Sequence, residues 1–162
     1  MKFCIALGSN LGNQRQVINT ATSLISTKIG KVLKESELYQ TKPLLHKQTV
    51  CRQQNDFLNS AILIESELPP EEVLSSLLSI EIELGRDRSQ SGKWEPRLID
   101  LDIIAVESII IDSLGLKIPH PEMHKRKFVL EPMQDIWPDW RHPILGKTCE
   151  ELFNDLCSRK VD

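Results

Sequence analysis

Residues 98–106 read LIDLDIIAV, and this stretch decides the fold. It is almost continuously apolar and is interrupted only by Asp100 and Asp102, a pattern typical of a strand inside a sheet. Side chains alternate between the two faces of a strand, so we expect the odd positions 99 to 105 on one face and the two aspartates on the other. The apolar neighbours favour a central strand.

Working outward, three further runs predict strands and two amphipathic segments predict helices. Apolar residues at helical spacing before Gly30 predict one helix, and Pro69-Pro70-Glu71-Glu72 predicts the start of another that ends at Gly85. The predicted strands cover residues 3–7, 32–39 and 57–64, and polar loops are expected at 43–54 and 86–96.

The predicted order of elements is therefore strand, helix, strand, strand, helix, strand. This is the ferredoxin-like βαββαβ pattern, an α+β fold in which helices pack on one face of an antiparallel sheet. Thr148 and Glu151 form a capping box that predicts one more helix, so we also expect a C-terminal helical extension.

Composition limits the class of protein. A chain of 162 residues suits one domain, and we take residues 1–162 as that single domain. The formal net charge of −3 argues against a nucleic-acid partner, and we expect no membrane segment. Four widely spaced cysteines without a C-x-x-C pair favour reduced thiols and a cytoplasmic location.

Asp100 and Asp102 are candidate metal ligands. Two carboxylates one residue apart on a strand can converge on one cation or bracket two, and hard oxygen ligands suit Mg²⁺. The alternative is that both side chains lie on the solvent-exposed face of the strand, which is the more common explanation of an isolated D-x-D. The apolar surroundings and nearby Arg97 favour a site, because unpaired carboxylates on a buried strand are costly.

Glu81 falls on the apolar stripe of the second predicted helix, near its end. A carboxylate there is either paired inside the protein or faces a pocket; the alternative is that a frayed last turn exposes it to water.

Two basic groups flank the aspartates in a chain that is acidic overall. One consists of Arg86, Arg88, Lys93 and Arg97; the other of His120, His124, Lys125, Arg126 and Lys127. Arginine binds phosphate through two parallel hydrogen bonds, so the pattern indicates a polyphosphate ligand, although each residue taken singly could be a solvated surface group. His120 stands in a rigid Pro-His-Pro turn and could be structural. Neither a P-loop nor a Rossmann glycine motif is present, and Gly8-Ser9-Asn10-Leu11-Gly12 is sufficiently explained as a tight turn.

Residues 93–104, KWEPRLIDLDII, resemble the signature of the 6-hydroxymethyl-7,8-dihydropterin pyrophosphokinase family of the folate pathway. Four further stretches match in the same order along the chain: residues 8–11 (GSNL), 39–44 (YQTKPL), 56–61 (DFLNSA) and 119–132 (PHPEMHKRKFVLEP). The resemblance covers nearly the whole chain and implies a ferredoxin-like fold.

The resemblance implies transfer of pyrophosphate from ATP to the hydroxymethyl group of the pterin, with release of AMP and with two Mg²⁺ ions held by Asp100 and Asp102. It implies a catalytic set of Arg86, Arg97, Asp100 and Asp102. It implies pterin binding by Thr41, Leu44, Phe57, Asn59, Trp94 and Phe128, and ATP binding by Glu81, Arg88, Trp94, Arg97, His120 and Arg126. The residues alone would assign Phe57 and Phe128 to the core. We expect a monomer whose only partners are these two small substrates.

Three positions depart from the family's pattern, namely Glu95, Lys42 and Pro121. Two other functions compete with the transferase. A magnesium-dependent nucleotidyltransferase would also combine Gly-Ser with D-x-D, but at a much shorter separation. A non-catalytic ferredoxin-like module that binds a small ligand would have no need for two aspartates beside a cluster of arginines.

Overall fold

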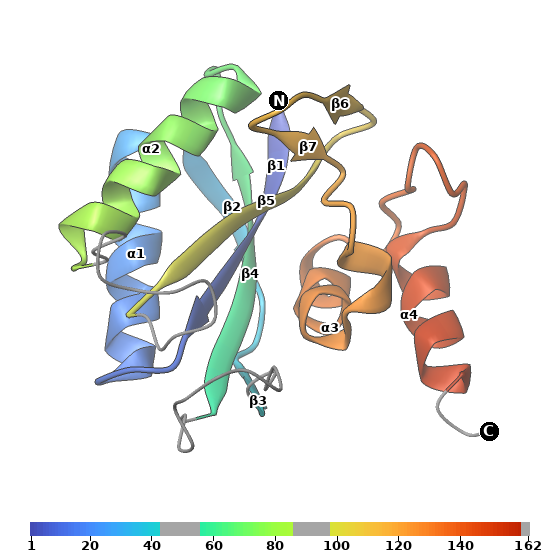
Figure 1. The fold of residues 1–162 in the computed structure, drawn as a ribbon, viewed down its shortest axis with the longest axis horizontal. Helices are drawn as coiled ribbons and strands as arrows, with labels where there is room; N and C mark the ends of the chain where they lie inside the picture. Colours follow the sequence, from blue (N-terminus) through green and yellow to red (C-terminus); the bar gives the residue numbers. More distant parts are fainter. Residues whose placement is uncertain (43–55, 86–97, 160–162) are drawn as a thin grey trace.

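The structure is a computed structural model that describes residues 1–42, 56–85 and 98–159. A five-stranded antiparallel sheet lies between two pairs of helices (Figure 1). The elements follow in the order β1 (Lys2–Ser9), α1 (Gln14–Lys28), β2 (Lys31–Glu35), β3 (Tyr39–Thr41), β4 (Phe57–Glu65), α2 (Pro70–Glu83), β5 (Asp100–Val106), β6 (Ile111–Asp112), β7 (Lys117–Ile118), the 3-10 turn η1 (Met123–Lys125), α3 (Lys127–Ile136) and α4 (Cys149–Ser158).

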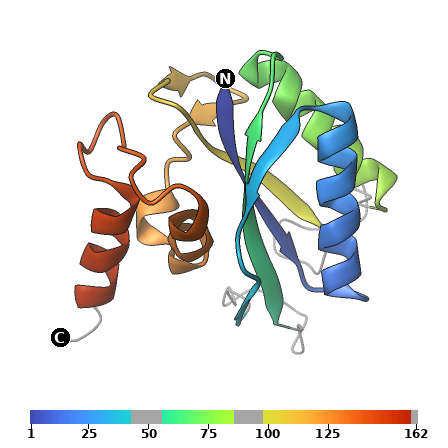
Figure 2. The ribbon, with the colours of Figure 1, turned by 180° about the vertical axis from the view of Figure 1, so that it is seen from behind.

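The strand order is β2-β4-β1-β5, and β3 also pairs with β4. Alternation along β1 divides the core between the two faces of the sheet. Phe3, Ile5 and Leu7 pack in the cluster covered by α1 and α2. Cys4 packs in the cluster covered by α3 and α4. Figure 2 shows the two helix pairs on opposite sides of the sheet.

A bulge in β5 changes the alternation predicted for this strand. Cys4 pairs with Ala105 and Ile5 with Ile103, so Ile104 is an extra residue in the ladder. Ala105 consequently lies with Ile104 in the cluster beneath α3, whereas Ile103 lies in the cluster beneath α2. The prediction that Ala105 shares a face with Ile103 is wrong for this reason.

The prediction that β5 is a central strand is also wrong, because β5 ends the strand order. Its apolar sequence reflects helices over both faces rather than strands on both sides. Its outer edge is partly satisfied by other groups: the backbone N–H of His120 donates to the carbonyl of Ile104 at 2.9 Å, and Glu81 accepts from Leu101. These bonds protect an edge that would otherwise offer unpaired groups.

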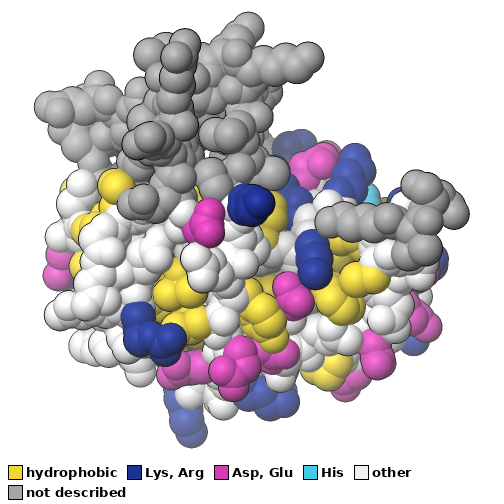
Figure 3. Space-filling model, turned by 90° about the horizontal axis from the view of Figure 1, so that it is seen from below, with side chains coloured by type: hydrophobic (Ala, Val, Ile, Leu, Met, Phe, Trp, Pro, Cys, Tyr) yellow, Lys and Arg dark blue, Asp and Glu magenta, His cyan; other side chains and the backbone are white. Residues whose placement is uncertain are grey.

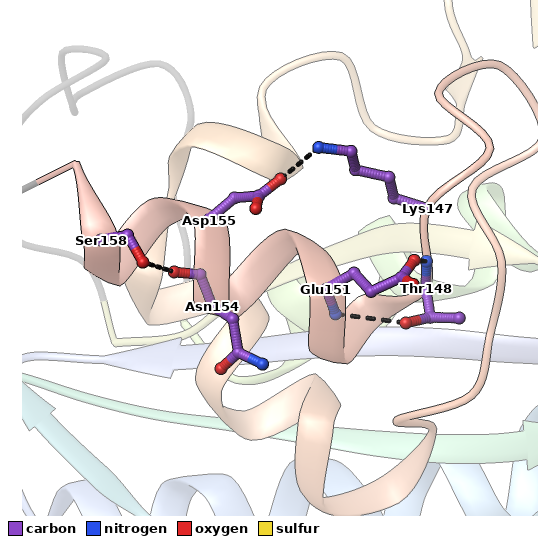
Figure 4. Close-up of polar contacts among 6 residues, drawn as sticks. All are labelled: Lys147, Thr148, Glu151, Asn154, Asp155 and Ser158. Atoms are coloured by element: carbon purple, nitrogen blue, oxygen red, sulfur yellow. Dashed lines mark hydrogen bonds and ion pairs between the residues drawn. The ribbon is translucent and has the colours of Figure 1, made fainter.

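The helix beginnings agree with the sequence. Asn13 caps α1 by accepting from the Gln16 N–H at 3.2 Å, and α2 begins at Pro70. The capping box of Thr148 and Glu151 is confirmed at the start of α4, which is the predicted C-terminal helix (Figure 4).

Several elements differ from expectation, and the short elements β6, β7 and η1 were not predicted. The strand predicted over 32–39 is divided into β2 and β3. Helix α3 was not predicted, and it contains Pro132, a residue that is normally unfavourable inside a helix. Its buried face, which includes Val129, Leu130 and Met133, packs against the sheet and outweighs that local penalty. The loops predicted at 43–54 and 86–96 lie outside the described residues.

In the part of the chain that the structure describes, no helix is both long enough and apolar enough to cross a bilayer.

Candidate active site

The candidate site lies on the face of the sheet that α3 covers, where β1 runs between β4 and β5. Gly8 pairs with Asn59 on one side and with Asp100 on the other. Ala6, one pair along the same face, lies next to Asp102. Adjacent strands are about 4.8 Å apart, so the backbones of Asn59 and Asp100 are separated by roughly 10 Å across Gly8. The sheet register thus places Asn59, whose amide is predicted to bind the pterin, near Asp100 and Asp102, the predicted metal ligands.

Asp100 and Asp102 begin β5, and both are partly exposed. Leu101 between them is buried beneath α2, so the two carboxylates share the opposite face, as predicted. Within residues 1–42, 56–85 and 98–159, no group of three or more His, Cys, Asp or Glu side chains could hold a metal ion. The donor set on β5 is therefore a carboxylate pair. Such a pair fits Mg²⁺, which usually completes its shell with water and substrate phosphates.

Glu81 is 1% exposed, which excludes the alternative of a frayed, solvated last turn. Its Oε1 accepts from the Leu101 backbone N–H at 2.8 Å. Leu101 lies between the two aspartates, so this bond fixes the backbone on which both are mounted. The Glu81 carboxylate is therefore paired inside the protein, which is one of the two possibilities predicted from the sequence.

His120 follows β7, and its backbone N–H donates to the carbonyl of Ile104 in β5 at 2.9 Å. Its Nδ1 accepts from the Glu122 N–H at 3.2 Å, so in the neutral ring the proton is on Nε2. Burial lowers the pKa of His120, and the charge of Arg126 lowers it further, while Glu122 and Asp100 act in the opposite direction. His120 is thus a neutral hydrogen-bond donor near pH 7, within the electrostatic range of Asp100.

Arg126 immediately precedes α3, and its guanidinium carbon lies 5.8 Å from the centre of the Phe128 ring. This cation–π contact holds a planar, charged donor beside Phe128 at the start of α3. Among the described residues of the face drawn in Figure 3, acidic, basic and hydrophobic side chains are interspersed.

Asn59 is 7% exposed, and its Nδ2 donates to Thr41 Oγ1 at 2.6 Å. Phe57, two residues earlier on the same face of β4, is half-buried. Phe128, on α3, is only partly buried against the cluster beneath that helix. A hydrogen-bonded amide together with partly exposed aromatic side chains suits a flat heterocycle with hydrogen-bonding groups on its edge.

Five predicted site residues lie outside the described residues: Leu44, Arg86, Arg88, Trp94 and Arg97. The structure brings together the remaining ones, which come from β3, β4, β5, α2 and the segment 120–128.

Two residues that hold the site together were missed by sequence reasoning. Ser9 Oγ donates to the Leu98 carbonyl at 2.5 Å, which ties the end of β1 to the approach to β5. Gln14 Nε2 donates to the carbonyls of Ser9 at 2.8 Å and Asp56 at 2.7 Å, which ties β1 to the start of β4. The Gly-Ser-Asn motif was the only signal for Ser9, and nothing in the sequence analysis pointed to Gln14. Strand β1 extends through Ser9 instead of turning at Gly8.

The described residues combine a carboxylate pair on β5 with a buried amide on β4, on one face of an antiparallel sheet that α3 covers. Such a combination suits enzymes that act on an anionic and a polar heterocyclic ligand together. The chain belongs to the 7,8-dihydro-6-hydroxymethylpterin-pyrophosphokinase (HPPK) family, whose sequence profile matches residues 4–138. Members of this family transfer pyrophosphate from ATP to hydroxymethyldihydropterin in folate biosynthesis.

Individual relatives agree. The chain is 36% identical over 142 residues to a 2-amino-4-hydroxy-6-hydroxymethyldihydropteridine pyrophosphokinase of Porphyromonas gingivalis, a match that covers 86% of this chain and 92% of that protein. It is 40% identical over 157 residues to the folic acid synthesis protein fol1 of Pneumocystis carinii. That match covers 97% of this chain but only 20% of the longer fol1 protein.

A solved structure supports the fold. Wild-type HPPK-DHPS of Plasmodium falciparum superposes with a TM-score of 0.74 at 17% identity, covering 98% of this chain and 45% of that one.

Proposed function

We propose that this chain transfers the β,γ-pyrophosphate of ATP to the hydroxymethyl oxygen of 6-hydroxymethyl-7,8-dihydropterin and releases AMP. The observation that carries the proposal is the sheet register, in which Gly8 separates Asn59 on β4 from Asp100 on β5. A pterin read by Asn59 would have its substituent directed toward the carboxylates. The acceptor oxygen and the triphosphate would then meet above β1.

The pterin would be held by Asn59 and by two aromatic side chains from different elements. Phe57 approaches from the sheet and Phe128 from α3, the arrangement needed to stack on both faces of one ring. The backbone of Thr41 would add polar contacts at the edge of the ring. Leu44 and Trp94, which lie outside the described residues, are proposed from the resemblance alone.

The triphosphate would be held by Asp100, Asp102, His120 and Arg126, with Arg86, Arg88, Trp94 and Arg97 proposed from the resemblance. Asp100 and Asp102 would hold two Mg²⁺ ions, which when bound neutralise phosphate charge. His120 would donate its Nε2 proton in a hydrogen bond to a phosphate oxygen, and Arg126 would offer paired N–H donors. Glu81 would act through the backbone of Leu101 rather than by touching ATP.

Catalysis in this proposal rests on orientation and charge. The residues hold the attacking oxygen in line with the phosphate and stabilise the charge that builds up on the equatorial oxygens. None of the described side chains is needed as a covalent nucleophile.

We also propose the finer features of the molecule. The strand order and antiparallel pairing support a ferredoxin-like arrangement of β1, α1, β2, β4, α2 and β5. The shared sheet between the two core clusters supports a single domain, and we infer a monomer. The free thiols of Cys4, Cys149 and Cys157 support a cytoplasmic location.

The test is AMP formation by the purified protein given ATP, Mg²⁺ and 6-hydroxymethyl-7,8-dihydropterin. We expect pterin-dependent AMP that falls about a hundredfold or more in Asp100→Asn, the size of an electrostatic contribution to the transition state. The matched control is Asp112→Asn, which removes an exposed carboxylate of β6 that pairs with Lys117 and should leave AMP formation unchanged.

The nucleotide product separates the alternatives. ADP would indicate a simple kinase, inorganic pyrophosphate would indicate a nucleotidyltransferase, and ligand binding without turnover would indicate a binding module. Any of these three results would contradict the proposed function.

A further inference from the structure

Gly8 has a role that its backbone conformation does not explain. Gly12, Gly85 and Gly146 have the positive φ angles that favour glycine, but Gly8 is not among them. Gly8 lies inside β1 and pairs on both sides, and a glycine inside a strand weakens it. The role of glycine at this position must therefore come from the absence of a side chain.

A side chain at Gly8 would meet the pterin subsite. A Cβ atom added there would lie 3.2 Å from Asn59 Oδ1 and 3.8 Å from Cδ1 of Phe57. The first distance is tighter than an ordinary van der Waals contact, so the Asn59 amide would have to move. Both neighbours are side chains proposed to bind the pterin.

The Asn59 amide is held from its other end. Its Nδ2 donates to Thr41 Oγ1 at 2.6 Å, so displacement away from Gly8 would strain or break this bond. The amide is thereby fixed between Gly8 of β1, which has no side chain, and the Thr41 hydroxyl of β3.

We propose that Gly8 and Thr41 are positioning residues that fix the orientation of the Asn59 amide and so set the selectivity for the amide-like edge of a pterin. This inference rests on the proposed function and goes beyond it, because neither residue needs to touch the ring through its side chain. A buried amide in one orientation discriminates donors from acceptors on a ligand, and a rotating amide does not.

The first experiment compares Gly8→Ala with Gly115→Ala. Gly115 lies between β6 and β7, and a Cβ there would meet nothing within 4 Å, so it controls for the chemical change itself. We expect Gly8→Ala to raise the dissociation constant and the KM for the pterin about tenfold, the worth of one misaligned hydrogen bond. The KM for ATP should stay within about twofold of wild type, and Gly115→Ala should match wild type in both constants.

The second experiment approaches the amide from β3 and does not depend on the folding of Gly8→Ala. Thr41→Val removes the acceptor of Asn59 and should weaken pterin binding about tenfold, while Thr41→Ser keeps the hydroxyl and should restore it. In NMR spectra, the side-chain NH₂ signals of Asn59 should shift in Gly8→Ala and Thr41→Val but not in Gly115→Ala or Thr41→Ser.

The outcomes separate this inference from the proposed function. A wild-type enzyme that makes pterin-dependent AMP, with Gly8→Ala and Thr41→Val indistinguishable from it in pterin affinity, would overturn the inference alone. Equal losses of pterin and ATP affinity would show a general structural defect and would overturn it too. A wild-type protein that neither binds the pterin nor forms AMP would overturn both.

Discussion

Glu81 is almost completely buried, and one of its hydrogen bonds joins α2 to the strand that carries the two aspartates. A buried carboxylate is costly unless hydrogen bonds compensate it. Glu81 accepts from the Leu101 N–H at 2.8 Å, and Leu101 is flanked by Asp100 and Asp102. The side chain therefore links the end of α2 to the backbone that carries the carboxylate pair. A change at Glu81 should reach the site through β5.

We expect Glu81→Ala to lower the free energy of unfolding by about 1–3 kcal/mol, because the Leu101 N–H is then left buried without its acceptor. The same change should lower kcat/KM about tenfold or more, since small displacements of reacting groups are expensive. Glu81→Gln retains an oxygen acceptor of nearly the same shape and should lie closer to wild type in both quantities. Urea unfolding and initial rates measure the two effects.

If the glutamine variant were as unstable and as slow as the alanine variant, the negative charge of Glu81 would matter more than its hydrogen bond to Leu101. The role through β5 would then have to be abandoned.

At the level of elements, α4 supports the part of the site that comes from α3. Cys149 and Leu152 of α4 lie in the same buried cluster as Val129 and Leu130 of α3. Burial raises the pKa of the Cys149 thiol to about 12, so this side chain packs as a neutral apolar group. Helix α3 in turn carries Phe128, which is proposed to stack on the pterin.

The capping box gives a direct test of α4 (Figure 4). Thr148 Oγ1 accepts from the Glu151 N–H at 3.2 Å, and Glu151 Oε2 accepts from the Thr148 N–H at 2.8 Å. We expect Thr148→Ala to lower the free energy of unfolding by about 1 kcal/mol, whereas Thr148→Ser should retain most of it. AMP formation below the unfolding transition should change little, because α4 acts on the site only through packing.

Thermal or urea unfolding of the three proteins decides this point. Equal stability of Thr148→Ala and wild type would mean that α4 is held by its buried face and not by its cap.

For the whole molecule, features set by neighbouring residues could be predicted from the sequence, whereas features set by pairing between distant segments could not. Helix caps at Asn13 and Thr148 depend on residues three positions away, so the sequence was sufficient for them. The face of β5 that carries Asp100 and Asp102 follows from alternation alone. The edge position of β5 and the contact of Gly8 with Asn59 depend on pairing between distant segments, which no local pattern encodes.

Among the residues that the structure describes, two histidines share one kind of turn. His120 and His142 each precede a proline, and each uses Nδ1 as the acceptor for a backbone N–H farther along the chain. For His142 the donors are the Ile144 and Leu145 N–H groups, both at 3.2 Å. The His142 ring is packed against Trp140, with ring centres 5.5 Å apart, and faces His124 at 6.4 Å.

This packing predicts how the stability of the molecule depends on pH. Burial, and then the charge of His124, lower the pKa of His142 from its ordinary value of 6.5. Between the lowered pKa and 6.5, the unfolded chain binds more protons than the folded one, so the free energy of unfolding should fall as pH decreases through this window and level off below it. His120, whose pKa is also lowered, contributes in the same direction.

The variant His142→Asn separates this contribution from the rest. Its side-chain oxygen can replace Nδ1 as the acceptor for Ile144 and Leu145 but does not titrate, because an amide has no ionisable proton in this range. We expect its loss of stability between pH 7 and pH 5 to be smaller than that of wild type when both are measured by urea unfolding. His142→Ala, which lacks the acceptor, should be less stable than either protein at pH 7. A pH dependence in His142→Asn as steep as in wild type would assign the acid sensitivity to other groups, with His120 the next to be replaced.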